Sequence, residues 1–336
     1  MSFRVGVLGT GAIGKDHARR LHRTIHGVEV VAVYDVNTDS AHECIKDIPG
    51  AVVMSTPEEL INSDIVDAIV ITSASFTHEE FCLKSIEANK PVFVEKPLAL
   101  SSEGSRKIVD LEMKLGRKLT QVGFMRRFDT GYLAMKKLLD SGEIGVPLVA
   151  HCAHRNVKAM PGADNLEAVN GSGIHEFDCM SWLLDDYFVS VQAIFPRKTK
   201  NALGELSDPQ ILIMTTSKGI VVDLEIFLNC KYGYDIQCEV VAEEGITKLQ
   251  DPSDIVIRRD AKLYTDILVD WKDRFIAAYD VELQAWADAV NRGDNVDGPS
   301  AWDGYSASLV SEAALKSQLS GQTEKIDITG RPEFYR

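Results

Sequence analysis

The sequence predicts an α/β protein with two domains. An N-terminal doubly wound parallel sheet is expected over residues 1–123, and an α+β domain with a large, mostly antiparallel open sheet over residues 124–336. In the first region short apolar runs alternate with helical patterns, which is typical of βαβ units. In the second region strand-like runs follow one another with few helices between them. The length of 336 residues also favours two domains over one.

Six apolar runs in the first domain predict strands, at 4–8, 28–34, 51–54, 68–72, 92–94 and 119–122. Helical periodicity predicts helices between them, near 12–26, 39–47, 77–89 and 101–115. Parallel neighbouring strands need long crossover connections, which are usually helices. The alternation therefore predicts a parallel sheet between two layers of helices.

The second domain is predicted to begin with a helix near 130–141 and to end with two long helices. Between them we expect another helix, near 173–185, and a series of strands. The end helices are 272–292 and 302–320, and the segments between are 148–155, 189–196, 210–217, 220–228, 235–242, 246–249 and 254–268. Ser217-Lys218-Gly219 is a hairpin signal between two of these runs. Consecutive strands of this kind predict antiparallel pairing.

Composition and charge exclude several classes of partner. The chain is 45% apolar and has a net charge of −14, with 50 acidic against 36 basic residues. This balance argues against a nucleic-acid or anionic-membrane surface. No apolar run approaches the roughly 20 residues of a membrane-spanning helix. The first residues enter a strand at once, so we expect no secretory signal and a cytoplasmic protein.

The six cysteines are scattered along the sequence without a C-x-x-C pair. We therefore expect reduced, mostly buried cysteines and no metal site.

A glycine-rich turn, Gly9-Thr10-Gly11-Ala12-Ile13-Gly14, joins the first predicted strand to the first predicted helix. In this context the first glycine permits a tight turn, the second lets the backbone approach a pyrophosphate, and the third lets helix and strand pack closely. The helix N-terminus offers free N–H groups to phosphates. The turn therefore predicts a Rossmann-type dinucleotide site, although a purely structural glycine turn is the alternative.

The end of the second strand indicates which dinucleotide binds. Asp35 stands there, followed by Val36 and Asn37. A carboxylate at this place accepts hydrogen bonds from ribose hydroxyls and repels a 2′-phosphate, and no arginine follows to attract one. We therefore expect NAD rather than NADP. Thr72-Ser73 ends another strand and is expected to line the cofactor site, while an ordinary strand-end aspartate is the alternative for Asp35.

Glu95-Lys96-Pro97 closes the apolar strand at 92–94. The carboxyl ends of parallel strands are where such sheets bind ligands, so Glu95 and Lys96 are expected beside the cofactor. A lysine there can stabilise negative charge that develops on a hydroxyl or carbonyl oxygen. Pro97 restricts the preceding residue to extended geometry, which helps to aim its side chain. The alternative is a solvated loop lysine.

A second cluster lies at the start of the helix predicted near 173–185. His175 and Asp178 are three residues apart and share a helix face, beside the apolar Ile174 and Phe177. A lone histidine among apolar residues is more often a satisfied core residue. In a chain that also binds a dinucleotide, an imidazole is the natural acceptor for an alcohol proton as a hydride leaves. His175 is therefore the candidate general base.

These features together resemble the glucose–fructose oxidoreductase/inositol dehydrogenase family, also called Gfo/Idh/MocA, over essentially the whole chain. Glu95-Lys96-Pro97 is specific to the family as a whole. Longer strings resemble its inositol dehydrogenase branch, namely 121–129 (QVGFMRRFD), 151–156 (HCAHRN), 230–236 (CKYGYDI) and 265–271 (TDILVDW). The resemblance implies a Rossmann domain, a C-terminal α/β domain with an open sheet, and a homotetramer joined through those sheets.

The resemblance also implies an activity, the NAD-dependent oxidation of myo-inositol or a close relative to a keto-inositol. Lys96 would hydrogen-bond the reacting oxygen, and His175 would act as general base. Positions implied to contact the substrate are Lys96, Arg126, His154, Gly171, His175, Asp178 and Tyr234, with Arg126 also near the cofactor. Convergent polar groups suit a polyol, since selectivity among epimers depends on paired donors and acceptors.

Gly171 departs from the family pattern. In similar enzymes the residue four before the catalytic histidine is usually an acid, which can orient the imidazole. Three explanations are open: a stand-in (Asn170, Ser172, Glu176 or a water), an altered substrate such as scyllo-inositol or another cyclic polyol or sugar, or a weakly active member. An NAD-sensing regulator on the same fold is a further alternative, as is, less favourably, a structural partner of an active enzyme. The presence of both Lys96 and His175 counts against a sensor.

Overall fold

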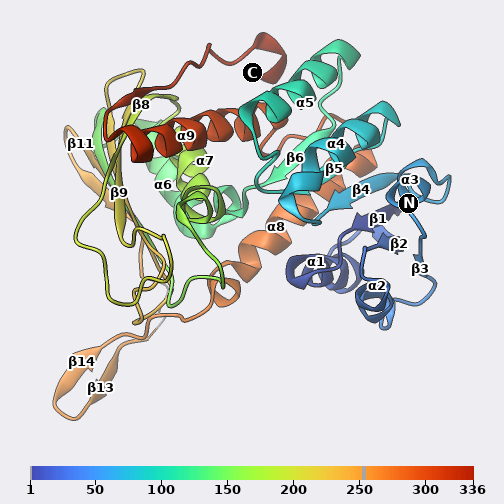
Figure 1. The fold of residues 1–336 in the computed structure, drawn as a ribbon, viewed down its shortest axis with the longest axis horizontal. Helices are drawn as coiled ribbons and strands as arrows, with labels where there is room; N and C mark the ends of the chain where they lie inside the picture. The colour runs from blue at the N-terminus through green and yellow to red at the C-terminus, as the bar shows by residue number, and fades with distance from the viewer. Residues whose placement is uncertain (1, 252–254) are drawn as a thin grey trace. The chain divides into compact units, whose positions relative to one another are not determined.

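The structure is a computed structural model that describes residues 2–251 and 255–336 (Figure 1). Its residues form two compact units. Unit 1 comprises Met1–Met125, Tyr279–Ser308 and Thr329–Arg336, and unit 2 comprises Arg126–Ala278 and Leu309–Ile328. The C-terminal part of the chain thus contributes to both units. The linear division into functional domains at residue 123 stays a prediction.

Unit 1 contains a six-stranded parallel sheet in the order β3-β2-β1-β4-β5-β6. The strands are β1 (Phe3–Leu8), β2 (Val28–Tyr34), β3 (Val52–Val53), β4 (Ala68–Ile71), β5 (Val92–Glu95) and β6 (Thr120–Gly123). The strand order reverses between β1 and β4, which is the switch point where doubly wound sheets bind ligands. All six predicted strands are present, and the predicted doubly wound fold is confirmed.

Helices flank this sheet, with α1 and α2 along one side and α4 and α5 along the other (Figure 1). The helices are α1 (Ala12–Arg23), α2 (Thr38–Ile45), α3 (Pro57–Asn62), α4 (His78–Glu87) and α5 (Ser102–Leu115). The sequence reasoning missed α3, which is only six residues long. Its local signals are clear in retrospect: Thr56 accepts a hydrogen bond from the Glu59 N–H, and Pro57 occupies the first turn.

Trp286 explains why a C-terminal segment belongs to unit 1. It lies on α8 (Trp271–Arg292) and is fully buried in the core around β1 and β2. Its ring meets Phe3 edge-on at a centroid distance of 5.5 Å and Phe93 at 5.9 Å. Aromatic pairs in this arrangement add roughly 0.5–1.5 kcal/mol beyond the area they bury.

Unit 2 contains a seven-stranded sheet in the order β12-β11-β7-β10-β9-β8-β15. Apart from the parallel pair β7 and β10, its strands pair antiparallel, which confirms the predicted fold class. The strands are β7 (Pro147–Arg155), β8 (Phe188–Ile194), β9 (Gln210–Thr216), β10 (Val221–Phe227), β11 (Asp235–Ala242), β12 (Ile246–Lys248) and β15 (Glu324–Lys325). The predicted hairpin joins β9 to β10, and Gly219 in its turn has φ +86°.

One face of this sheet is covered by helices and the other is more open. Side chains along β9, β10 and β11 alternate between buried and half-buried. The covered side faces α6 (Thr130–Ser141), α7 (Ile174–Leu183) and the second half of α9 (Ala301–Ser320) (Figure 1). Contacts such as Ser317 Oγ accepting from the Ala193 N–H hold α9 to β8.

The predicted strand 254–268 is wrong in its described part; residue 254 lies outside the described residues. The chain forms a short hairpin instead, with β13 (Ile257–Arg259) antiparallel to β14 (Lys262–Tyr264). Asp260 and Ala261 at its tip have φ of +53° and +56°. Two successive residues with positive φ make the tight turn that reverses a strand, and Asp-Ala carries no glycine to signal it.

Two further features bear on the predictions. All six cysteines are free and five of them are buried, as expected. Within the described residues, no helix is at once long and apolar enough to cross a lipid bilayer.

Candidate active site

The glycine turn of unit 1 has the geometry that a dinucleotide requires. Gly9 has φ +95°, and a Cβ there would lie 2.4 Å from the backbone of Ser73. A Cβ on Gly14 would lie 2.0 Å from the carbonyl oxygen of Gly9. At Gly11, by contrast, a Cβ would meet no atom within 4 Å. The first and third glycines therefore serve close packing, and the second leaves open space where a phosphate can approach the backbone.

Asp35 is held in place by the same turn. Its Oδ2 accepts hydrogen bonds from the backbone N–H of Thr10 at 2.6 Å and the Thr10 hydroxyl at 3.1 Å, and its Oδ1 accepts from the Asn37 N–H at 2.8 Å. The next side chain, Val36, is 89% exposed. A carboxylate oxygen accepts more than one hydrogen bond. Asp35 can therefore also accept hydrogen bonds from ribose hydroxyls while the turn holds it in place. The residues present thus fit NAD.

Glu95 connects the end of β5 to helix α1. Its Oε1 lies 2.8 Å from Nε2 of His17, and its Oε2 accepts a hydrogen bond from the Lys96 N–H at 3.3 Å. His17 is fully buried and packs edge-on against Phe93. The sequence reasoning missed His17, which lies on α1 three residues after Gly14. This buried contact fixes the backbone from which the half-buried Lys96 extends.

His78 links two loops that carry predicted cofactor contacts. Its Nδ1 lies 2.7 Å from the carbonyl oxygen of Pro97, and its Nε2 lies 3.1 Å from that of Ser73. Burial lowers the pKa of His78, although both carbonyls oppose this shift. The neutral ring donates to one carbonyl at a time. His78 therefore ties the segment after Lys96 to the end of β4, and the Lys96–Pro97 peptide bond beside it is cis.

Unit 2 brings together Arg126, His154 and Glu176, whose side chains are at most 4% exposed. Arg126 forms an ion pair with Glu176. Nδ1 of His154 lies 3.1 Å from both the Arg126 guanidinium and Oε2 of Glu176. That nitrogen accepts from Arg126 in one tautomer and donates to Glu176 in the other. The three side chains form a single buried charged cluster.

Burial and the neighbouring charges together set the pKa values of the ionisable groups in and beside this cluster. Burial acts to raise the pKa of Glu176, but the charges of Arg126 and His154 outweigh it and lower the pKa on balance. Burial is also the main cause that raises the pKa of Tyr234 to about 12. Tyr234 is thus a protonated phenol at neutral pH and can donate its O–H.

His175 lies next to this cluster, at the first turn of α7. It is 7% exposed, and its ring centroid lies 6.2 Å from that of His154. The Tyr234 ring centroid lies 6.1 Å from that of His154. Asp178 is differently placed: it is buried and accepts a hydrogen bond from Nε of Arg127 at 2.9 Å. Unit 2 therefore brings together most of the predicted substrate positions, and their substrate roles stay predictions.

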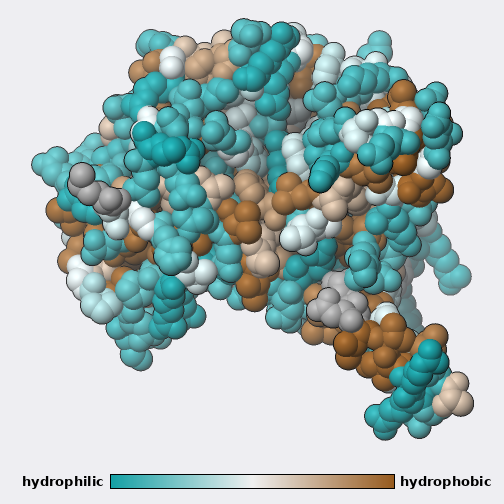
Figure 2. All heavy atoms as spheres, turned by 180° about the vertical axis from the view of Figure 1, so that it is seen from behind, coloured by the Kyte–Doolittle hydropathy of each residue, from teal (hydrophilic) through white to brown (hydrophobic). Residues whose placement is uncertain are grey.

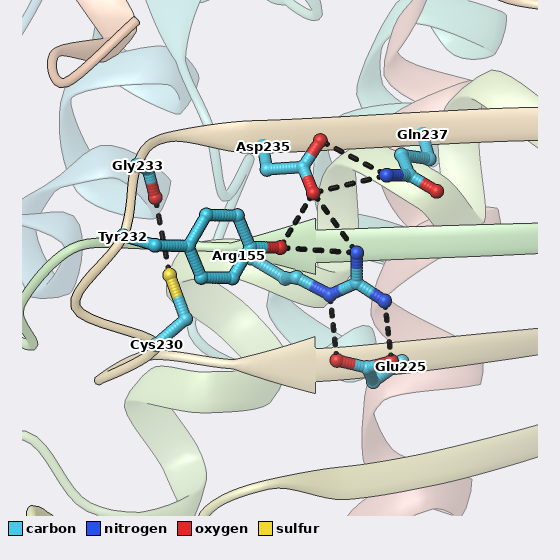
Figure 3. Close-up of polar contacts among 7 residues, drawn as sticks. All are labelled: Arg155, Glu225, Cys230, Tyr232, Gly233, Asp235 and Gln237. Carbon is cyan, nitrogen blue, oxygen red and sulfur yellow. Dashed lines mark hydrogen bonds and ion pairs between the residues drawn. The ribbon is translucent and has the colours of Figure 1, made fainter. Parts of the chain in front are cut away.

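A polar network joins β7, β10 and the start of β11, at residues close in sequence to His154 and Tyr234 (Figure 3). Arg155 donates two hydrogen bonds of 2.7 Å to Glu225 and one of 2.9 Å to Asp235. Tyr232 donates to the same Asp235 at 2.6 Å. Arg155 follows His154, and Tyr232 and Asp235 flank Tyr234. The strings at 151–156 and 230–236 thus include a structural clamp as well as predicted substrate contacts.

The structure also distinguishes among the residues that could replace the acid missing at position 171. Glu176 is engaged by Arg126 and His154, and Ser172 is buried. The buried Oδ1 of Asn170 accepts no hydrogen bond within the described residues. Glu167, which the sequence reasoning did not consider, places its carboxylate against Gly171. No group of His, Cys, Asp and Glu side chains in residues 2–251 and 255–336 is arranged to hold a metal ion.

Comparison with known protein families shows to which family the chain belongs. Residues 3–124 match the model of the Gfo/Idh/MocA oxidoreductase family with an NAD-binding Rossmann fold, and residues 136–328 match the C-terminal alpha/beta domain of the same family. The chain belongs to the Gfo/Idh/MocA oxidoreductase family. The predicted resemblance, the oxidoreductase class and the NAD cofactor are thereby confirmed.

Individual family members match along the entire chain. An inositol 2-dehydrogenase of Azotobacter vinelandii is 52% identical over 336 residues, covering 100% of this chain and 99% of its own. One of Pseudomonas fluorescens is also 52% identical, with 100% of both chains covered. The crystal structure of a Lactobacillus casei myo-inositol dehydrogenase in complex with NAD(H) and myo-inositol is 39% identical, covers 100% of both chains and gives a TM-score of 0.98.

Proposed function

We propose that this Gfo/Idh/MocA member is an inositol dehydrogenase that oxidises myo-inositol, or a closely related inositol, to a keto-inositol with NAD. The main support is the 52% identity to inositol 2-dehydrogenases over the whole chain. The convergence of His154, His175 and Tyr234 in unit 2 adds to it. A ring with several hydroxyls needs such donors and acceptors to be told apart from its epimers.

The proposed chemistry divides between two residues. Lys96 donates a hydrogen bond to the reacting hydroxyl oxygen and stabilises the negative charge that develops there. His175 accepts the hydroxyl proton. NAD, when bound, accepts the hydride from the carbon atom that carries this hydroxyl. Of the other predicted substrate positions, Tyr234 offers an O–H donor, whereas Arg126 and Asp178 are paired within the protein and would act through their neighbours.

The direct test is the absorbance of NADH during incubation with NAD and a panel of polyols. The panel contains myo-, scyllo- and D-chiro-inositol together with common sugars. We expect the fastest turnover with an inositol, and the ranking of epimers identifies the substrate. If a sugar is oxidised and none of the inositols is, the substrate is that sugar and not an inositol. Tight NAD binding without turnover of any compound would favour a sensor, against which the presence of both Lys96 and His175 counts.

The role of His175 predicts a pH dependence. A base must be deprotonated to accept a proton, so kcat/KM is expected to rise with pH through the range of about 6–8 in which imidazoles titrate. The measurement is initial rate against pH at saturating NAD. His175→Asn should abolish this rise together with most of the activity. A wild-type profile that is flat across the range would remove His175 from the role of base.

Asp35 predicts the choice of cofactor. Asp35→Ser removes the charge that repels a 2′-phosphate and the acceptors for the ribose hydroxyls. We expect NAD affinity to fall about tenfold or more, because hydrogen bonds to a charged group contribute roughly 1.5–3 kcal/mol, and NADP affinity to rise. Fluorescence titration with NADH and NADPH measures both. If the preference is unchanged, the ribose contact lies elsewhere.

We also propose a homotetramer in the cytoplasm, as the family resemblance implies. The open face of the unit 2 sheet presents half-buried side chains on β9, β10 and β11. Apolar surface is also exposed at the hairpin, at the lower right of Figure 2, where Ile255, Val256 and Leu263 are 60–64% exposed. Exposed apolar side chains such as those at the hairpin are typical of protein interfaces, whereas the open face of the sheet also carries charged side chains such as Glu225 and Asp235. Light scattering coupled to gel filtration gives the oligomeric state, and a monomer at micromolar concentration would exclude the tetramer.

A further inference from the structure

A carboxylate occupies the place that a side chain at position 171 would take. A Cβ built on Gly171 would lie 2.0 Å from Oε1 of Glu167 and 2.5 Å from its Cδ. The Glu167 side chain is exposed, so its carboxylate reaches this point along the surface of the helix. An acid is therefore present beside residue 171 although the residue itself has no side chain.

The helix places this carboxylate in line with His175. Asp164 accepts a hydrogen bond from the Glu167 N–H, a π-helix runs over Glu167–Gly173, and α7 follows from Ile174. A π turn contains more than four residues, whereas an α turn contains about 3.6 residues. A step of four residues falls short of one turn in a π-helix and exceeds one turn in an α-helix, so the step from 171 to 175, which spans both segments, is close to one whole turn. Gly171 and His175 therefore lie nearly in line along the helix surface, and residue 167 lies a fraction of a turn to one side.

Side-chain direction brings the two groups to the same spot. Helical side chains lean toward the N-terminus, so a side chain at position 175 covers the turn that contains Gly171. The Glu167 carboxylate reaches that turn from the other side. With glycine at 171, no side chain of the intervening residue stands between the acid and the histidine.

We propose that Glu167 is a positioning residue for His175. Its carboxylate stabilises the protonated imidazole and holds the ring for proton transfer. The proposal rests on the proposed function, in which His175 receives the proton of the substrate hydroxyl. The acid has in effect moved one turn along the helix, and glycine at 171 makes room for it.

The other candidates fit this role less well. Glu176 is 1% exposed and bound by Arg126 and His154. Asn170 and Ser172 are neutral, so they can hydrogen-bond a ring but cannot offset its positive charge. Asp178 is paired with Arg127. Among these residues, Glu167 combines a negative charge with a place against Gly171.

The first experiment compares Glu167→Gln with the wild type in the full-length protein. The His175 ring is titrated by NMR in the absence of substrate, with ¹³C-labelled histidine and His175→Asn for assignment. Loss of a nearby negative charge should lower the titration midpoint of His175. The pH profile of kcat/KM should move the same way, and kcat should fall about tenfold. Asp164→Asn is the matched control: it removes one charge from the residue just before this helix, keeps the capping oxygen, and should leave both midpoints unchanged.

The second experiment is a rescue. Glu167→Ala vacates the space at Gly171, and adding Gly171→Asp supplies a carboxylate from position 171 itself. The double variant should recover most of the midpoint and of kcat that Glu167→Ala loses. The proposal is overturned if Glu167→Gln titrates and turns over like the wild type, or if the double variant is no better than Glu167→Ala. A wild type that oxidises no polyol would refute the proposed function, while the NMR midpoint would still decide the placement of Glu167.

Discussion

Lys96→Ala is expected to lower kcat by about 10²–10³-fold, the usual effect of removing one donor that stabilises developing oxyanion charge. The affinity for NAD should change little, because the lost interaction strengthens only as the hydroxyl proton leaves. The backbone at this position is held independently of the lysine side chain, by the Glu95 contacts with His17 and with the Lys96 N–H. Stopped-flow rates of NADH formation and a fluorescence titration of NADH measure the two effects separately.

A control and a contrary outcome complete this test. Lys107→Ala removes a lysine of the same unit that is 52% exposed and pairs with Glu79, and it should leave both kcat and NADH affinity unchanged. If Lys96→Ala weakens NADH binding as much as it lowers kcat, then Lys96 has a binding role and the oxygen is polarised by another group. Lys96→Arg keeps the charge but not the compact donor, so partial activity would point to charge as the main contribution.

Much of unit 1 could be predicted because its signals are local. Glycines at 9, 11 and 14 each mark a backbone position where a side chain would clash or would block an approach. Alternating apolar runs then predict the strands that carry Asp35 and Lys96. His17 was missed because its partner Glu95 is distant in sequence, and no periodicity connects a helix residue to the end of another strand.

The region before His175 could not be predicted for a different reason. A π-helix satisfies its backbone through i→i+5 hydrogen bonds, and this pattern has no simple residue signature. The sequence shows that an acid is missing at position 171, but not that the Glu167 carboxylate folds back into the vacant space. Such a compensation depends on the path of one flexible side chain, which only the three-dimensional structure reveals.

The division of the chain into its two compact units could not be predicted from sequence patterns either. Helices at 272–292 and 302–320 were expected in one domain, yet the structure assigns parts of both to each unit. Trp286 is packed against Phe3 and Phe93, so a long-range aromatic contact decides where this part of α8 belongs. Helical periodicity identifies an apolar face but not the surface that the face meets.

The buried pair of Arg126 and Glu176 predicts a large effect on stability. Glu176→Gln should lower the free energy of unfolding by about 3–5 kcal/mol, since removal of one partner leaves the other charge buried without compensation. Both side chains are only 1% exposed. Asp140→Asn is the matched control in the same unit: its pair with Lys136 is 55% exposed on the Asp140 side, and its loss should cost less than about 0.5 kcal/mol. Urea titration measures both.

The pH dependence of this loss gives a second check. The pKa of Glu176 is lowered in the folded protein by Arg126 and then His154, against the opposing effect of burial. A lowered pKa means that the unfolded chain binds the proton more readily. The carboxylate therefore contributes stability above the ordinary glutamate range, and this contribution is lost as pH falls through the folded value. The difference between wild type and Glu176→Gln should be largest near neutral pH and shrink toward pH 4.

A double-mutant cycle separates the pair from its parts. If the cost of Glu176→Gln comes from stranding the Arg126 charge, then removing that charge as well should recover part of it. Arg126→Met/Glu176→Gln should thus be less destabilised than the sum of the two single variants by about 0.5–3 kcal/mol. Simple additivity would mean that each side chain acts through its other contacts, such as the 3.1 Å contacts to His154. Because His154 would then be the shared partner, His154→Gln would be expected to cost as much as either single variant.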